Sequence, residues 1–298
     1  MIVSYDLSSS DLIGAMNNGV IGQVPPGSEN AMTSSYAIRY LPSQGANDSL
    51  LYDLSGKNRN ATINGSIVVN GRTITSTLTP ATAWSGLGIT LGSATGALPV
   101  LDPVVLNNYR PDQGDSLLLF AKMYIPSIPA TGNTKTIFGS QGTNGSSQNN
   151  GIRFVIGCQD HALPGTISLI SYDGIGGSKF SGTSSGVVTT LVDNYLAWYL
   201  EGSTAKVKLY VNGVASLAGT NQFYLRNFYT DILTSTTANT PPFGIGGGGR
   251  DLSVGIPNAV IKQFDMIIVK GRSISDPDAL VSKLTSFPSI PISEGDIS

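Results

Sequence analysis

The chain has 298 residues, of which only 12% are charged, and its 17 basic residues nearly balance its 19 acidic ones. An average soluble protein has about 25% charged residues. No run of basic side chains is present to neutralise a phosphate backbone, so we expect no nucleic-acid partner. The single cysteine, Cys158, and the single histidine, His161, exclude an intramolecular disulfide and a zinc site built from several such ligands.

The first 47 residues show little periodicity and contain Pro25, Pro26 and Pro42 among many Ser, Asn and Gly residues. Such a segment cannot bury enough apolar surface to fold alone. We therefore predict an extended N-terminal arm over residues 1–47 that attaches to a partner. Its start lacks a basic region followed by an apolar core, so we expect no secretory signal peptide and synthesis in a cytoplasm. No apolar run in the chain approaches the roughly 18 residues of a membrane helix, so no membrane insertion is expected.

Beyond the arm, short apolar runs follow one another between turn-forming residues. In Lys206–Val211 the apolar side chains alternate with polar ones, and Asn212-Gly213 supplies the positive φ angles of a type I′ hairpin turn. Many short strands with such turn signals are typical of an all-β sandwich or barrel. The predicted strands are Thr62–Val69, Arg72–Leu78, Leu87–Leu91, Leu117–Ile125, Lys135–Phe138, Ile152–Ile156, Thr166–Tyr172, Val187–Val192, Tyr195–Leu200, Lys206–Val211 and Ala259–Val269.

One short helix is predicted near the C-terminus. Ser275 can cap it and approximates a capping box with Asp278, while Pro277 suits the first turn. An apolar stripe follows, formed by Leu280, Val281 and Leu284, so the helix is expected to lie on the sandwich. The tail over residues 288–298 has no further periodicity, and we expect it to be extended or disordered.

Four segments in chain order carry a family resemblance: Tyr52–Gly65, Ala197–Gly213, Phe243–Gly247 and Ile261–Leu284. They resemble an opening aspartate turn, a tryptophan-led hairpin, a glycine-rich strand and a closing strand with its helix. This pattern is similar to the concanavalin A-like lectin/glucanase superfamily, in particular its laminin-G-like members. The resemblance implies a jelly-roll sandwich of two antiparallel sheets. We therefore predict an arm over residues 1–47, a lectin-like jelly-roll domain over residues 48–287 and a tail over residues 288–298.

The fold does not decide the function, because it carries hydrolases, lectins and structural modules. The glucanases that the chain resembles use closely spaced carboxylates, since retaining hydrolysis needs a nucleophile and an acid/base about 5 Å apart. The glutamates of this chain are widely scattered, at Glu29, Glu201 and Glu294. We therefore predict no catalytic residues and expect that the chain is not an enzyme.

Two aspartates and one tryptophan are candidate binding residues. Asp53 matches the opening aspartate of the family, and we expect it to organise the turn at Ser55-Gly56. The superfamily resemblance also implies a calcium role for Asp53, with Asp265 as a further oxygen ligand. No other cofactor is expected. Trp84 could stack on a sugar face, whereas Trp198 lies in an apolar run and is predicted to be in the core.

The low charge, the near absence of cysteine, the missing export signal and the lectin-like fold behind an arm resemble virion proteins of tailed bacteriophages. The resulting prediction is a non-catalytic virion structural protein, either a capsid decoration protein or a tail-associated host-binding protein. Its expected partners are other capsid or tail subunits, further copies of itself and a host surface glycan. The alternative is a carbohydrate-binding lectin module, and a glycan-degrading hydrolase is the least favoured reading.

Overall fold

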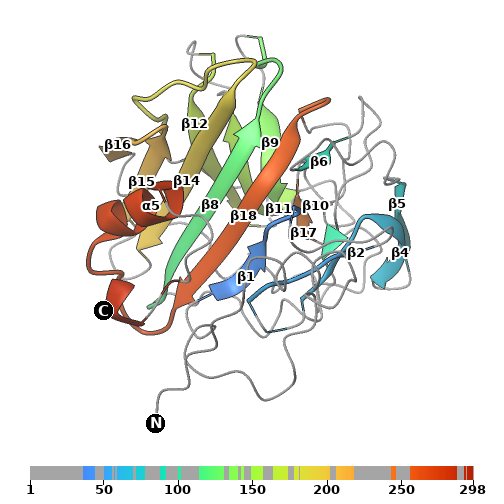
Figure 1. Cartoon of the computed structure of the whole chain (residues 1–298), viewed down its shortest axis with the longest axis horizontal. Coiled ribbons are helices and arrows are strands. Elements are labelled where there is room, and N and C mark those ends of the chain that lie inside the picture. The colour runs from blue at the N-terminus through green and yellow to red at the C-terminus, as the bar shows by residue number, and fades with distance from the viewer. Residues whose placement is uncertain are drawn as a thin grey trace, which may run out of the picture.

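The structure of the chain is a computed structural model (Figure 1). Two antiparallel β-sheets account for most of its described part. It describes residues 36–43, 50–55, 57, 59–69, 72–77, 88–91, 100–101, 114–130, 134–139, 142–143, 149–156, 164–173, 178–180, 182–201, 206–217, 243–245, 256–286, 292 and 294–297. The all-β sandwich expected from the sequence is confirmed. Within the described residues, no helix has the length and apolar character needed to cross a membrane.

The first sheet has seven described strands and the second has nine. In the first sheet the strand order is β1-β18-β8-β14-β15-β16, with β6 beside β18. Its strands are β1 (Tyr36–Tyr40), β6 (Ile89–Thr90), β8 (Ser116–Tyr124), β14 (Asp193–Glu201), β15 (Lys206–Val211), β16 (Val214–Leu217) and β18 (Val260–Val269).

The nine-stranded sheet runs in the order β13-β12-β11-β9-β17-β7-β3-β2, with β10 beside β11. Its strands are β2 (Leu50–Leu51), β3 (Ala61–Thr62), β7 (Val100–Leu101), β9 (Lys135–Gly139), β10 (Gly142–Thr143), β11 (Asn149–Ile156), β12 (Ile167–Asp173), β13 (Ser178–Phe180) and β17 (Phe243–Ile245). A separate hairpin joins β4 (Asn64–Val69) to β5 (Arg72–Thr77).

The main core lies between the two sheets, and Trp198 is at its centre. Successive side chains of a strand point to opposite faces, so Trp198 and its alternate neighbours on β14 point toward the nine-stranded sheet. Its ring meets the edges of Phe138 and Phe154, with ring centroids 5.8 and 5.7 Å apart. Its indole N–H donates to the carbonyl of Ser168 at 2.9 Å. The indole thus joins both sheets, and the prediction that Trp198 is a core residue is confirmed.

The predicted boundary of the N-terminal arm differs from the structure, because β1 belongs to the sandwich. Strand β1 pairs with β18, with Arg39 opposite Asp265. Ile38 and Tyr40 are fully buried in the core between the sheets. Strand β1 was not predicted because core-facing and outward side chains alternate over only five residues, and the charged Arg39 lies in the middle. Residues 1–35 of the predicted arm lie outside the described residues.

The segment Val187–Val192 is not a strand, although its β-branched composition predicted one. The side chain of Asn194 holds it as a turn: Oδ1 accepts the N–H of Thr189 at 2.9 Å, and Nδ2 donates to the carbonyls of Thr189 and Val192. Leu191 has a φ of 65°, a conformation that extended strands do not contain. Local side-chain hydrogen bonding therefore outweighs strand propensity here.

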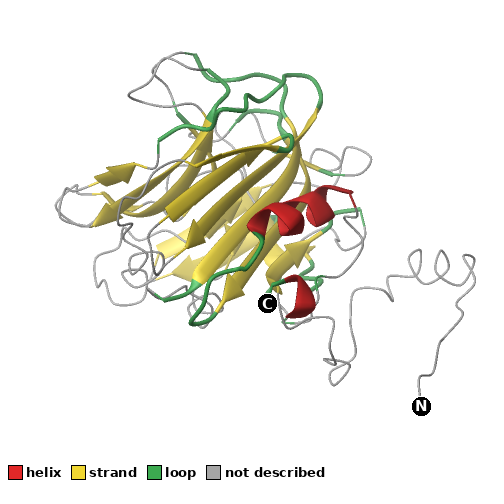
Figure 2. Cartoon of the chain, turned by 90° about the vertical axis from the view of Figure 1, so that its left-hand side faces the viewer, coloured by secondary structure: helices red, strands yellow, loops and turns green. Residues whose placement is uncertain are grey.

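Helix α5 (Pro277–Ser286) lies across the outer face of the seven-stranded sheet, the face turned away from the other sheet (Figure 2). Leu280, Val281 and Leu284 are buried as predicted. The cap differs from the prediction, because Asp276 rather than Ser275 accepts the N–H of Ala279, at 2.9 Å. The tail also differs: its described part contains the 3₁₀ turn η3 (Glu294–Asp296). Two of its side chains, Ile292 and Ile297, are buried beside α5.

Candidate functional site: the outer face of the seven-stranded sheet

The outer face of the seven-stranded sheet is covered by α5 at one end only. The outward side chains at the covered end form an apolar cluster with the helix, including Leu118, Ala197 and Ile267. At the other end the same alternation brings polar and aromatic side chains to the surface. There Tyr195 of β14 is opposite Lys122 of β8, and Asp193 is opposite Tyr124. We call Lys122, Tyr124, Asp193, Tyr195 and Lys262 the lysine–tyrosine strip.

The charges of the strip converge on one carboxylate. The ammonium group of Lys262 lies 2.8 Å from Oδ1 of Asp193, and that of Lys122 lies 3.7 Å from Oδ2. The side chains are 26% exposed for both lysines and 28% exposed for Asp193. Two cations thus share one anion in a partly desolvated setting, which leaves the strip with a net positive charge. Attraction of an incoming anion is stronger there than at a fully hydrated lysine.

The aromatic part of the strip is half-buried. Tyr195 and Tyr124 are both partly exposed. The Tyr195 ring lies 6.4 Å from the buried ring of Phe120, measured between centroids, and the ammonium group of Lys122 is 5.3 Å from its centroid. Contacts with a packed ring and with a cation hold the tyrosine in one orientation. The strip therefore presents a fixed aromatic group beside hydrogen-bond donors and acceptors.

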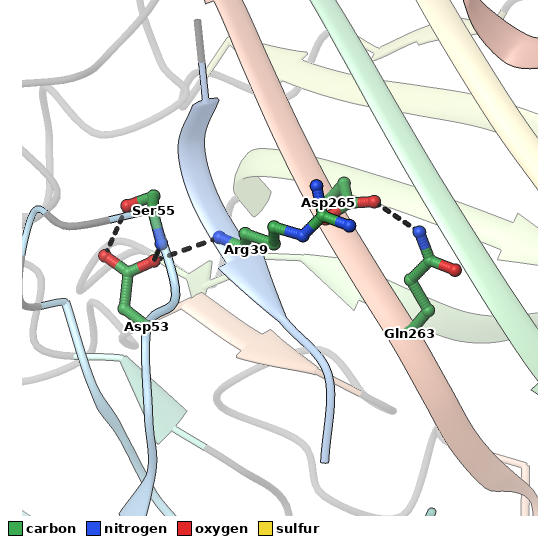
Figure 3. A network of polar contacts seen from close by, with 5 residues as sticks. All are labelled: Arg39, Asp53, Ser55, Gln263 and Asp265. Atoms are coloured by element: carbon green, nitrogen blue, oxygen red, sulfur yellow. Dashed lines mark hydrogen bonds and ion pairs between the residues drawn. The ribbon is translucent and has the colours of Figure 1, made fainter. Parts of the chain in front are cut away.

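A buried polar cluster adjoins the strip on the same face, around Asp265 of β18. Asp265 is fully buried, and Nε2 of Gln263 donates to its Oδ2 at 2.6 Å. Its Oδ1 lies 3.9 Å from Nε of Arg39, too far for a hydrogen bond. Burial raises the pKa of Asp265 to about 6, although Arg39 and Gln263 oppose the shift. Figure 3 shows the side chain of Arg39 extending from β1 toward Asp265, while its backbone N–H is directed at Asp53.

Asp53 organises its turn as the sequence predicted. Its Oδ1 accepts the N–H groups of Arg39 and Ser55, both at 3.0 Å. Its Oδ2 accepts the hydroxyl of Ser55 at 2.7 Å and the N–H of Arg59 at 3.0 Å. The N–H of Leu54 donates to the carbonyl of Arg39 at 2.8 Å, so this turn also closes the outer edge of β1. Four protein donors thus satisfy both oxygens of Asp53.

These residues do not fit the calcium site that the family resemblance implied. Calcium takes six to eight oxygen ligands. Asp53 is surrounded by N–H and O–H donors, and Asp265 faces a guanidinium group and an amide N–H. Within the part of the chain that the structure describes, no three His, Cys, Asp or Glu residues gather as metal ligands. The two aspartates contact different parts of Arg39: Asp53 accepts its backbone N–H, and Asp265 faces its guanidinium group (Figure 3).

Trp84, the other candidate named from the sequence, lies outside the described residues. The sequence analysis missed the lysine–tyrosine strip, although one signal was present. In Asp193–Glu201 the outward positions alternate with core positions and carry Asp193, Tyr195 and Tyr199. Large polar-tipped side chains on one face of a central strand indicate a surface that is covered or used. Whether such a surface is covered or used for binding depends on where α5 lies, and the periodicity of the sequence does not determine the position of the helix.

Comparisons with known proteins give matches among solved structures. No protein family and no curated protein matches the chain. Among solved structures, a Trypanosoma rangeli sialidase in complex with 2,3-difluoro-KDN matches 93% of this chain at 13% identity with a TM-score of 0.49. The chain spans 38% of the length of that sialidase. The CBM40 of a Ruminococcus gnavus IT-sialidase, bound to alpha2,3 sialyllactose, matches 65% of this chain and 91% of its own length at 14% identity, with a TM-score of 0.42.

The expectation that the chain is not an enzyme is corrected by this finding. The structures that match it include sialidases, which are enzymes, in several complexes. The expectation rested on the spacing of glutamates in glucanases, and that criterion covers only one way of cleaving a glycosidic bond. Sialidases use a tyrosine nucleophile instead. Scattered glutamates are therefore no ground for excluding catalysis.

Proposed function

We propose that the chain is a carbohydrate-binding module and that the lysine–tyrosine strip holds the glycan. A sugar ring has an apolar C–H face and a rim of hydroxyl groups. The partly exposed ring of Tyr195 offers apolar surface, and the phenol, carboxylate and ammonium groups around it offer donors and acceptors. The observation that carries the proposal is this fixed aromatic ring beside a charged cluster, on the part of the sheet face that α5 leaves uncovered.

The charge of the strip favours an acidic sugar. Lys122 and Lys262 share the single carboxylate of Asp193, so a second carboxylate brought by the ligand would find an ammonium group to pair with. Charge-assisted hydrogen bonds of this kind are roughly twice as strong as neutral ones. The ligand class is therefore a glycan that ends in a carboxylated sugar. Sialyllactose is the ligand named for the CBM40 domains described above, and it is a suitable probe.

Calorimetric titration of the full chain with alpha2,3 sialyllactose and with lactose tests this proposal. Sialyllactose should bind more tightly than lactose, since only the former carries a carboxylate. Lys122→Ala and Tyr195→Ala should each weaken binding about tenfold, the effect of losing one charge-assisted contact or one stacking ring. Tyr195→Phe should retain most of the affinity, because it keeps the ring.

Lys206→Ala is the matched control, since this lysine of β15 pairs with Glu201 at the far end of β14. Its affinity for sialyllactose should equal that of the parent chain. A loss in Lys206→Ala as large as in Lys122→Ala would contradict the proposed location. Equal affinity for lactose and sialyllactose would contradict the acidic sugar, and no binding to any member of a glycan array would contradict the proposal as a whole.

The composition supports a second proposal, that the module works as part of a tailed-bacteriophage particle. A protein assembled in a cytoplasm and released by lysis needs neither disulfides nor an export signal, and this chain has one cysteine and 12% charged residues. In that setting the strip would face a host surface glycan. Mass spectrometry of purified particles would detect the chain at a fixed copy number if the proposal is correct, and its absence from the particles would contradict it.

A further inference from the structure

Strand β18 contains one extra residue where it passes the lysine–tyrosine strip. Ile261 of β18 pairs with Met123 of β8. The next paired residue is Gln263, opposite Lys122, so Lys262 has no partner on β8. One extra residue in one strand of an antiparallel pair is a β-bulge, which bends that strand and redirects a side chain. The irregularity therefore lies within the strip itself.

The bulge brings two successive polar side chains to the outer sheet face. Their neighbours on either side, Ile261 and Phe264, point into the main core. Strict alternation would direct only one of the two residues between them outward. Here Gln263 is buried and donates to the outward carboxylate of Asp265 at 2.6 Å. Lys262 instead extends across β8 to the carboxylate of the strip on β14.

The stem of Lys262 is held against the backbone of Gly88, which directly precedes β6. A Cβ added to Gly88 would lie 3.1 Å from Cγ of Lys262 and 2.7 Å from the carbonyl oxygen of Ile261. Only a glycine allows two segments to approach this closely. The close contact limits the directions in which Lys262 can leave the bulge.

The two lysines of the strip are not equivalent at Asp193. The ammonium group of Lys262 lies 2.8 Å from Oδ1 and 3.0 Å from Oδ2, within hydrogen-bond range of both oxygens. The ammonium group of Lys122 lies 3.7 Å from Oδ2, beyond that range, and 5.3 Å from the centroid of the Tyr195 ring. Lys262 thus neutralises the carboxylate, whereas no hydrogen bond to Asp193 engages the N–H donors of Lys122.

We infer that Lys122 binds the carboxylate of the sugar and that Lys262 is a positioning residue, which acts through Asp193. Because Lys262 holds both oxygens of Asp193, this carboxylate neither draws Lys122 away from the Tyr195 ring nor repels the ligand. Both effects would be strong in a partly desolvated setting. The inference rests on the proposed glycan binding and assigns different roles to the two lysines of that site.

Calorimetric titration with alpha2,3 sialyllactose tests these roles, with methionine removing each charge while it keeps an unbranched stem. Lys122→Met and Lys262→Met should each weaken binding about tenfold, the effect of losing a hydrogen bond to a charged group. Adding Asp193→Asn to Lys262→Met should return the affinity to near that of the parent, because no carboxylate remains to compete for Lys122. Adding Asp193→Asn to Lys122→Met should leave binding weak, because the contact with the ligand is still missing.

The two double variants supply the decisive comparison. They have the same net charge in the strip and differ in the lysine that remains, so they separate a specific role from a general effect of charge. Equal recovery in both, or recovery in neither, would overturn the inference. Lys262→Arg keeps a cation for both oxygens of Asp193 and should bind like the parent. Thermal melting checks that every variant is folded.

Failure of the proposed function would give a different result. A parent chain that binds no sialyllactose, or whose binding is unchanged in Lys122→Met, would show that the strip is not the glycan site, and the inference would fall with it. Binding that is lost in Lys122→Met but unaffected in Lys262→Met would leave the glycan site in place and overturn only the positioning role of Lys262.

Discussion

Asp265 is a carboxyl group whose burial opposes its own ionisation. It has one hydrogen bond from Gln263 and a distant guanidinium group, and burial raises its pKa to about 6 from an ordinary value of 3.8. Between these two values the folded chain binds the proton more tightly than the unfolded chain. The contribution of Asp265 to stability is therefore fully present below about pH 4 and is lost as the pH rises through 6.

The free energy of unfolding of the parent chain should accordingly change with pH relative to Asp265→Asn. The asparagine cannot titrate but keeps an oxygen for Gln263. From pH 7 to pH 4 the parent should gain about 3 kcal/mol relative to the variant, the equivalent of two pKa units. Urea denaturation of both proteins at several pH values measures the difference. Parallel stability profiles would show that Asp265 does not titrate in this window.

Asp53 acts on four donors at once, so its removal should be costly. Asp53→Ala leaves the N–H groups of Arg39, Ser55 and Arg59 without the oxygens that accept them. We expect a loss of about 2–4 kcal/mol, because a buried donor left unsatisfied costs about 1–3 kcal/mol and water will satisfy some of them. Asp53→Asn, which keeps one acceptor, should lose less. Thermal melting distinguishes the two, and equal losses would contradict this account.

At the scale of elements, the N-terminus of α5 offers a direct test of the corrected cap. Asp276 accepts the N–H of Ala279, so Asp276→Ala should destabilise the chain by about 1 kcal/mol. Ser275→Ala should have a smaller effect, since Ser275 does not accept that N–H. Urea denaturation of the two variants measures this difference. A larger loss for Ser275→Ala would restore the capping box that the sequence predicted.

The elements best predicted from sequence are a hairpin with a recognisable turn and strands with long apolar runs, which are buried on both faces. The hairpin of β15 and β16 is encoded in alternation and in Asn212-Gly213, which have φ angles of 51° and 82° as a type I′ turn requires. Strands β8, β14 and β18 were found because their runs are long and apolar. Strand β1 was missed because its hydrogen bonds on one side come from Asp53 and Leu54, and sequence periodicity carries no information about such partners.

The same reasoning explains what was predicted of the site. The local role of Asp53 could be inferred from its place before Ser55-Gly56, since an Asx turn needs only neighbours in sequence. The lysine–tyrosine strip could not, because its members come from three strands. Lys122 and Lys262 meet at Asp193 only when β18, β8 and β14 adopt the observed register. A one-residue shift would turn these side chains toward the core.

At the scale of the whole molecule, the N-terminal boundary of the folded unit can be tested by shortening the chain. A chain that begins at residue 35 keeps β1, whereas one that begins at residue 50 loses it together with the buried Ile38 and Tyr40. We expect the first to melt cooperatively close to the parent. The second should be strongly destabilised or aggregate, because each of these two side chains is worth several kcal/mol of core packing. Calorimetry compares the three, and a parent-like melt of the shorter chain would contradict this boundary.

At the β1 side of the seven-stranded sheet, the turn of Asp53 occupies backbone groups that another strand would need for pairing. The carboxylate of Asp53 accepts the N–H of Arg39, and the N–H of Leu54 donates to the carbonyl of Arg39, so another strand cannot pair with β1 at this residue. Growth of a fibre by strand addition would require both edges of the sheet, so the Asp53 turn opposes such growth at β1.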